Sequence, residues 1–102
     1  MTSNSGSTQR TVVITGASRR IGRAIALDMA AGGWSIAIHY RHSKSDAQAL
    51  CSEIQASGGR AAIFHADLQD FQALGRLMSD CAAVLGIPSC LINNASEFLL
   101  DS

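Results

Sequence analysis

The sequence predicts an α/β protein built on a doubly wound parallel sheet, of which about four strands and three helices are present. Short apolar runs rich in β-branched residues alternate along the chain with segments of helical periodicity. The connections between them are short, which favours right-handed βαβ units. A complete sheet of this Rossmann-like kind has about six strands. We therefore expect residues 11–102 to be the N-terminal half of one domain, preceded by a flexible tail at residues 1–10.

The first strand and the first helix are predicted on either side of a glycine turn. Thr11–Thr15 is an apolar, β-branched run that stops at Gly16, which is typical of a buried parallel strand. From about Arg20 to Ala31 the period changes to that of a helix, which Gly32-Gly33 ends. The predicted apolar stripe of this helix consists of Ile21, Ala24, Ile25 and Met29.

The second and third strands are predicted at Trp34–Tyr40 and Arg60–His65. Ser43 or Ser45 can cap the helix between them, and this helix stops at Gly58-Gly59. Its apolar positions are Ala47, Leu50, Cys51 and Ile54.

The third helix is predicted to begin after Asp70, which is a suitable capping residue. Gly86-Ile87-Pro88 ends it, and Ser89–Ile92 begins a fourth strand. The predicted apolar stripe consists of Phe71, Leu74, Met78, Cys81 and Leu85.

Composition narrows the class of function. The chain has 102 residues, enough for one small domain, and 47% of them are hydrophobic. Eight basic residues balance eight acidic ones, so no net charge points to nucleic acid or to an anionic membrane. No apolar run approaches the roughly 20 residues of a membrane span, and Met1–Gln9 lacks the pattern of a signal peptide. We expect a cytoplasmic protein.

The cysteines and histidines carry no sign of a metal site. Cys51, Cys81 and Cys90 are widely spaced among apolar neighbours, which predicts reduced, buried side chains. The three histidines are scattered, and no metal-ligand or Ser/His/Asp spacing forms around them.

The turn after the first strand reads TGASRRIG, from Thr15 to Gly22. Gly16 permits a tight turn, and the small Ala17 and Ser18 let the backbone approach a ligand. Backbone N–H groups at the start of the helix would face a pyrophosphate. Gly22 would allow close packing of the helix. The turn is therefore predicted to cradle phosphate.

Arginines surround this turn. Arg19, Arg20 and Arg23 lie at a helix N-terminus, where cations oppose the helix dipole. They are explained if an anion binds there. The alternative is that they are ordinary solvated surface residues.

The end of the second strand favours a phosphorylated ribose. An NAD site has a carboxylate about 20 residues past the glycines, but here the chain reads His39-Tyr40-Arg41-His42-Ser43 and the first acid is Asp46. A 2′-phosphate would find Arg41, His42 and Ser43, which favours NADPH over NADH. Which of Arg41 and His42 makes the main contact stays open, and an ordinary polar loop is the alternative.

These motifs together resemble the short-chain dehydrogenase/reductase family from Thr11 to Leu100. TGASRRIG is similar to that family's TGxxxGxG turn, with Arg20 at the middle glycine. Asn93-Asn94-Ala95-Ser96 is similar to its NNAG segment, with Ser96 at the glycine. Both departures and the HYRHS stretch resemble the pteridine reductases within the family.

The resemblance implies an NADPH site. It implies that Asp67 accepts a hydrogen bond from the adenine amino group, with a capping or loop aspartate as the alternative. It also implies substrate contacts by Arg20, Ser96 and Phe98, whose ring would stack on a pterin; the alternative for Phe98 is a core position. The candidate cofactor-binding residues are Gly16, Ser18, Arg19, Arg20, Ile21, Gly22, His39, Tyr40, Arg41, His42, Ser43, Asp67, Leu68, Asn94, Ala95 and Ser96.

No catalytic residue is predicted. The family's chemistry needs a tyrosine with a lysine four residues later, and Tyr40 and Lys44 have that spacing only by coincidence, because Tyr40 ends the second strand on the adenosine side. We predict the NADPH-binding part of a reductase acting on a pterin-like or carbonyl small molecule and, at full length, forming a homo-oligomer. The alternatives are a non-catalytic nucleotide-binding module, or a reductase of ketone or acyl substrates.

Overall fold

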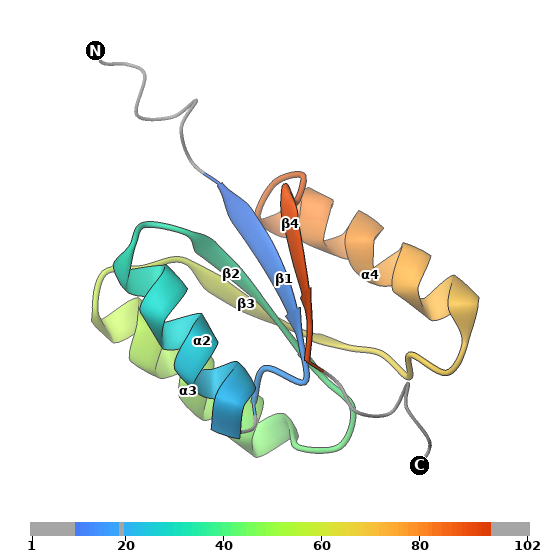
Figure 1. Ribbon diagram of the computed structural model, residues 1–102, viewed down its shortest axis with the longest axis horizontal. Coiled ribbons are helices and arrows are strands. Elements are labelled where there is room, and N and C mark those ends of the chain that lie inside the picture. The colour runs from blue at the N-terminus through green and yellow to red at the C-terminus, as the bar shows by residue number, and fades with distance from the viewer. Residues whose placement is uncertain (1–9, 19, 95–102) are drawn as a thin grey trace.

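The computed structural model of the chain describes residues 10–18 and 20–94, which form four strands and three helices (Figure 1). This confirms the predicted α/β class and the order of the elements, and each strand begins and ends within one residue of its predicted position. Predictions for residues 1–9, Arg19, Ala95, Ser96 and Phe98 lie outside the described residues. The elements are β1 (Thr11–Thr15), α2 (Arg20–Ala31), β2 (Ser35–Tyr40), α3 (Lys44–Ala56), β3 (Ala61–His65), α4 (Phe71–Val84) and β4 (Cys90–Asn93).

The four strands form one sheet in the order β3-β2-β1-β4, and every neighbouring pair is parallel. Helices α2 and α3 cover one face of this sheet and α4 lies on the other (Figure 1). The strand order therefore reverses at β1, because β2 and β3 extend the sheet on one side of it and β4 on the other. The carboxyl ends of the parallel strands meet at one edge of the sheet. In open α/β sheets, ligands bind at this edge, next to the point where the strand order reverses.

The sheet is the centre of the core. Every residue of β1 and β2 is buried, because helices cover both faces of these two inner strands. Toward α2 and α3 the strands contribute residues such as Ile14, Ile36 and Ile38. Toward α4 they contribute Val13 and Ala37.

The predicted stripe of α2 is partly wrong. Ile21 and Ala24 are exposed, whereas Gly22 and Ala26 are the buried residues of the helix, and Ile25 and Met29 are partly buried beside them. Small residues thus occupy the contact line, and Gly22 lies close against the turn after β1.

The predicted stripe of α4 is also partly wrong. Phe71 is 93% exposed, since it lies in the first turn of the helix. Leu74 and Met78 only flank the contact. Ala73 and Leu77 are buried with the correctly predicted Cys81 and Leu85. The bulkiest residue of the periodic pattern thus lies outside the core, and the smaller Ala73 lies nearer the sheet.

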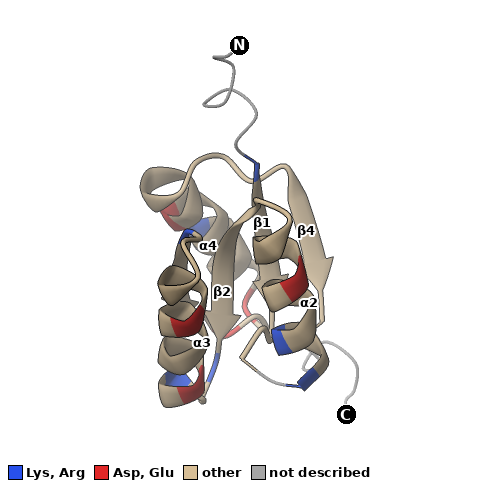
Figure 2. Cartoon of the chain, turned by 90° about the vertical axis from the view of Figure 1, so that its left-hand side faces the viewer, with Lys and Arg blue, Asp and Glu red and all other residues tan. Residues whose placement is uncertain are grey.

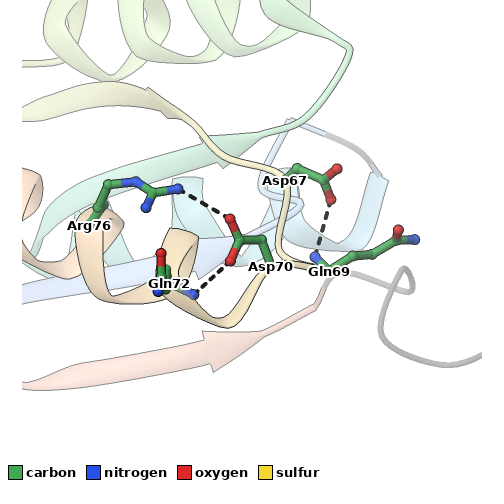
Figure 3. Close-up of polar contacts among 5 residues, drawn as sticks. All are labelled: Asp67, Gln69, Asp70, Gln72 and Arg76. Atoms are coloured by element: carbon green, nitrogen blue, oxygen red, sulfur yellow. Dashed lines mark hydrogen bonds and ion pairs between the residues drawn. The ribbon is translucent and has the colours of Figure 1, made fainter.

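The predicted capping hydrogen bond is present at the start of α4 but not at the start of α3. Asp70 caps α4 as predicted: its Oδ1 accepts a hydrogen bond of 2.9 Å from the backbone N–H of Gln72 (Figure 3). Ser43 occupies the capping position of α3 without a side-chain capping bond. In residues 10–18 and 20–94, no helix has the length and hydropathy needed to cross a membrane.

Replacing Asp70 by alanine is expected to lower the free energy of unfolding by about 1 kcal/mol, since the N–H of Gln72 then loses its protein acceptor. The Asp70 carboxylate also lies 3.4 Å from Arg76, but both side chains are more than half exposed, so Arg76→Ala is expected to change stability by less than about 0.5 kcal/mol. Urea unfolding of the two variants measures both effects. Equal losses would mean that the ion pair, and not the cap, carries the stabilisation.

Candidate functional site

The candidate site lies where four chain segments leave the carboxyl edge of the sheet. The glycine turn follows β1, residues 41–43 follow β2, residues 66–68 follow β3, and Asn94 follows β4. The structure thus brings together, at one edge, the described residues that the sequence analysis singled out.

The glycine turn has the geometry that its sequence predicts. Gly16 has a φ of 63°, in the left-handed region that glycine adopts without strain. Gly22, in the first turn of α2, lies so near that a Cβ on it would come within 2.6 Å of the Gly16 carbonyl oxygen and 2.9 Å of the Cα of Ala17. Only a glycine at position 22 lets the helix begin this close to the turn.

On one side the turn is fastened to β4. The Thr15 hydroxyl donates to the Asn93 side-chain oxygen at 3.0 Å and accepts from the backbone N–H of Asn94 at 2.8 Å. The Asn94 amide in turn donates to the Gly16 carbonyl at 3.3 Å. The Asn94 side chain therefore holds the backbone of the turn directly, and Asn93 holds it through the Thr15 hydroxyl.

On the other side the turn is fastened to β2 through His39, whose side chain is 1% exposed. Its Nδ1 accepts from the N–H of Gly16 at 2.9 Å, and its Nε2 lies 2.8 Å from the carbonyl oxygen of Ala66. Its own carbonyl accepts from the N–H of Ala17 at 3.2 Å. The ring of His39, one of the predicted cofactor-binding residues, is enclosed within the protein, where it bonds to the backbone.

The start of α2 presents positive charge to the same edge. The first N–H groups of a helix have no partner within the helix, and the first turn of α2 contains no acidic residue. Arg20 is exposed there and has a φ of 25°, which is strained for a residue with a side chain. Arg23 points elsewhere, because it pairs with Glu53 of α3. Figure 2 shows basic residues at the start of α2 and at the end of β2.

The ends of β2 and β3 are linked by a charge pair. Asp67 Oδ2 lies 3.5 Å from the Arg41 guanidinium. Its other oxygen accepts a 3.1 Å bond from the N–H of Gln69 in the loop before α4 (Figure 3). His42 is exposed and Ser43 is half-buried. Arg41 is thus the basic residue at this corner that the structure holds in a defined position.

Two further residues predicted to bind the cofactor, Tyr40 and Leu68, have buried side chains. Tyr40 is largely buried, its ring lies 5.5 Å from that of His65, and its carbonyl accepts from the N–H of Ala66. The Leu68 side chain is in the core under α4, so only its backbone can face a ligand.

The cysteines lie away from this edge and are free. Cys81 is buried, while Cys51 and Cys90 are half-buried, so the prediction of burial holds in full only for Cys81. Burial raises the pKa of the Cys51 and Cys81 thiols, which keeps them protonated at neutral pH. The described part of the chain contains no group of side chains suited to a metal ion.

Sequence reasoning missed Thr15 and Asn93 as the residues that fasten the turn, and it missed the structural part played by His39. One signal was present for each. A threonine and an asparagine at the ends of neighbouring strands are suited to bond each other. A histidine inside a run of buried strand residues must have partners for its ring nitrogens.

Comparison with known proteins identifies this arrangement. The sequence model of the short chain dehydrogenase family matches residues 10–98. A 3-oxoacyl-[acyl-carrier-protein] reductase of Staphylococcus aureus is 35% identical over 86 residues, which cover 84% of this chain and 35% of that protein. The chain therefore spans about a third of the length of the curated relatives it matches.

Solved structures agree with the observed fold. A dehydrogenase/reductase of Sinorhizobium meliloti superposes with a TM-score of 0.81 at 38% identity, over 84% of this chain and 34% of that one. The FolM alternative dihydrofolate reductase 1 of Brucella canis, complexed with NADP, superposes with a TM-score of 0.82 at 36% identity, over 91% of this chain and 37% of that one.

Gly22→Ala is expected to lower the free energy of unfolding by about 1–3 kcal/mol, because the new methyl group meets backbone atoms that cannot move independently. Gly75→Ala is the matched control: it is also a helical glycine, but a methyl group added to it would have nothing within 4 Å, and it is expected to stabilise by about 0.4–1 kcal/mol. Denaturant unfolding measures both. A Gly22→Ala variant as stable as Gly75→Ala would contradict the close approach of α2 to the turn.

Proposed function

This chain belongs to the short-chain dehydrogenase family, and on that premise we propose that residues 11–102 are the N-terminal half of its dinucleotide-binding domain and bind NADPH. The observation that carries the proposal is the glycine turn after β1. It is fastened to both neighbouring strands and is followed by a helix start with exposed Arg20 and no acidic residue in its first turn. Such a helix start binds phosphate groups through backbone N–H groups and positive charge.

The choice of NADPH over NADH depends on the end of β2. A carboxylate there would accept bonds from a 2′-hydroxyl, but the residues are Arg41, His42 and Ser43, and Asp46 lies beyond them on α3. Of the two basic residues, Arg41 is the better partner for a 2′-phosphate. Its guanidinium is held at the sheet edge beside Asp67, and a planar guanidinium can bond a phosphate through two N–H groups. The similar Brucella canis structure contains NADP.

The substrate proposal follows from the same edge. In the complete protein, the cofactor would pass a hydride to a pterin-like C=N or a related unsaturated group, with Arg20 beside both the cofactor phosphates and the substrate. Arg20 takes the place of a glycine despite its strained φ, which is understandable if its side chain has a function. Similarity to an alternative dihydrofolate reductase supports this proposal. A ketone or acyl thioester is the second candidate, supported by similarity to a 3-oxoacyl reductase.

The decisive experiment starts from the coding DNA downstream of the Ser102 codon. The protein encoded by the complete reading frame is assayed for NADPH oxidation with a dihydropterin and, separately, with a 3-oxoacyl thioester. Turnover of the pterin supports the first substrate. Turnover of the thioester alone rules it out in favour of the second. A reading frame with no Tyr-x-x-x-Lys segment downstream of Ser102, whose product binds NADPH without turnover, identifies a non-catalytic nucleotide-binding module.

Arg41→Ala is expected to weaken NADPH binding about tenfold while leaving NADH binding nearly unchanged, because only NADPH has the 2′-phosphate that the guanidinium would bond. His42→Ala is the control and is expected to change either affinity by less than about threefold, since that side chain is exposed. Fluorescence titration with each nucleotide measures the ratio. Parallel losses for NADPH and NADH in Arg41→Ala would show that Arg41 maintains the loop and does not select the cofactor.

A further inference from the structure

His39 stands in an unusual place for a histidine. It lies in β2, an inner strand of the sheet, on the face that Ala37 presents toward α4, and it is 1% exposed. A polar ring in such a position must have its nitrogens bonded, since an unbonded buried polar group is costly. Both nitrogens lie within hydrogen-bond distance of backbone groups.

The partners of the ring determine its protonation. Gly16 N–H, 2.9 Å from Nδ1, can only donate, and the Ala66 carbonyl, 2.8 Å from Nε2, can only accept. Nδ1 must therefore present a lone pair while Nε2 carries the proton. One neutral tautomer satisfies both contacts, and a ring protonated on both nitrogens would set two donors against each other at Gly16.

We propose that His39, as the neutral Nε2–H tautomer, is a positioning residue for the phosphate-binding turn. The role rests on the proposed function, because it acts on a cofactor only through the turn. The ring holds Gly16, while the main-chain carbonyl of the same residue holds Ala17. The N–H groups of Gly16 and Ala17 thereby point into the protein. The N–H groups at the start of α2 remain to face the cofactor phosphates.

The sheet order explains why this task falls to β2. The strand lies between β1 and β3, so one ring near its carboxyl end reaches the segments that follow both neighbours. It bonds Gly16 after β1 and Ala66 after β3. Ala66 is adjacent to Asp67, for which the family resemblance implies a hydrogen bond with the adenine amino group. The ring therefore links the segment that follows β1 to the segment that follows β3.

Two substitutions separate the two contacts of the ring, because each removes one of them and keeps the other. The side-chain amide of asparagine ends near the position of Nδ1, so His39→Asn can still offer an oxygen to Gly16 but cannot reach Ala66. The longer glutamine places its amide near the position of Nε2, so His39→Gln can donate to Ala66 but leaves Gly16 without an acceptor. Each variant keeps one hydrogen bond and loses the other.

The measurements are made on the protein encoded by the complete reading frame, by NADPH titration and urea unfolding of each variant. Comparable losses of stability are expected for both. The NADPH dissociation constant is expected to rise about tenfold in His39→Gln and less than about threefold in His39→Asn. Affinity losses that are equal in the two variants, or larger in His39→Asn, would overturn the proposal, because a purely structural histidine gives no such separation.

A spectroscopic measurement keeps the two proposals distinguishable and needs no variant to fold. Nitrogen-15 NMR of the histidine rings is expected to show His39 with an unprotonated Nδ1 and a protonated Nε2. The opposite tautomer, in a protein that binds NADPH, would overturn the role of His39 alone. The expected tautomer in a protein that fails to bind NADPH would overturn the proposed function, and with it the positioning role.

Discussion

The arrangement of the candidate site depends on how the turn between β1 and α2 is bonded to the sheet. His39 holds it from β2, and Asn94, just after β4, holds it through bonds to the Thr15 hydroxyl and the Gly16 carbonyl. These bonds fix the position of Gly16, against which Gly22 packs with no room for a side chain. The first residues of α2 therefore have one possible position relative to the sheet edge. Loss of either set of bonds would free the helix start as well as the turn.

This fastening divides the backbone donors of the turn between two tasks. Gly16 and Ala17 donate into the protein, to the ring and to the carbonyl of His39. The donors that follow, in the first turn of α2, have no partner within the helix. A phosphate bound there meets groups that are already oriented, so less free energy is lost in ordering them when it binds. The bonds that hold Gly16 and Ala17 in place thus strengthen phosphate binding by the N–H groups that follow them.

The sequence predicted the strands well because their signals are local. Short apolar runs next to Gly16, Gly33 and Gly59, and one that follows Gly86-Ile87-Pro88, place every strand within one residue. The helix faces were less predictable, since Phe71 and Ile21 fit a helical period but are exposed to solvent. The candidate site residues were located because they follow strands, and parallel strands all end at the same edge. What His39 bonds could not be derived in this way, because it depends on which strands flank β2, and that is known only from the sheet order.

The Arg41–Asp67 pair indicates how the proposed site would distinguish its nucleotide. The two charges are 3.5 Å apart, with side chains 27% and 50% exposed, so solvent screens their attraction and the pair is weak. A 2′-phosphate offers Arg41 more charge and two oxygens, which is the stronger interaction. Its arrival would draw the guanidinium away and release one oxygen of Asp67, whose other oxygen stays bonded to Gln69. Under the proposed function, NADPH would engage Arg41 in this way, whereas NADH, which lacks the 2′-phosphate, would leave the Arg41–Asp67 pair as it stands.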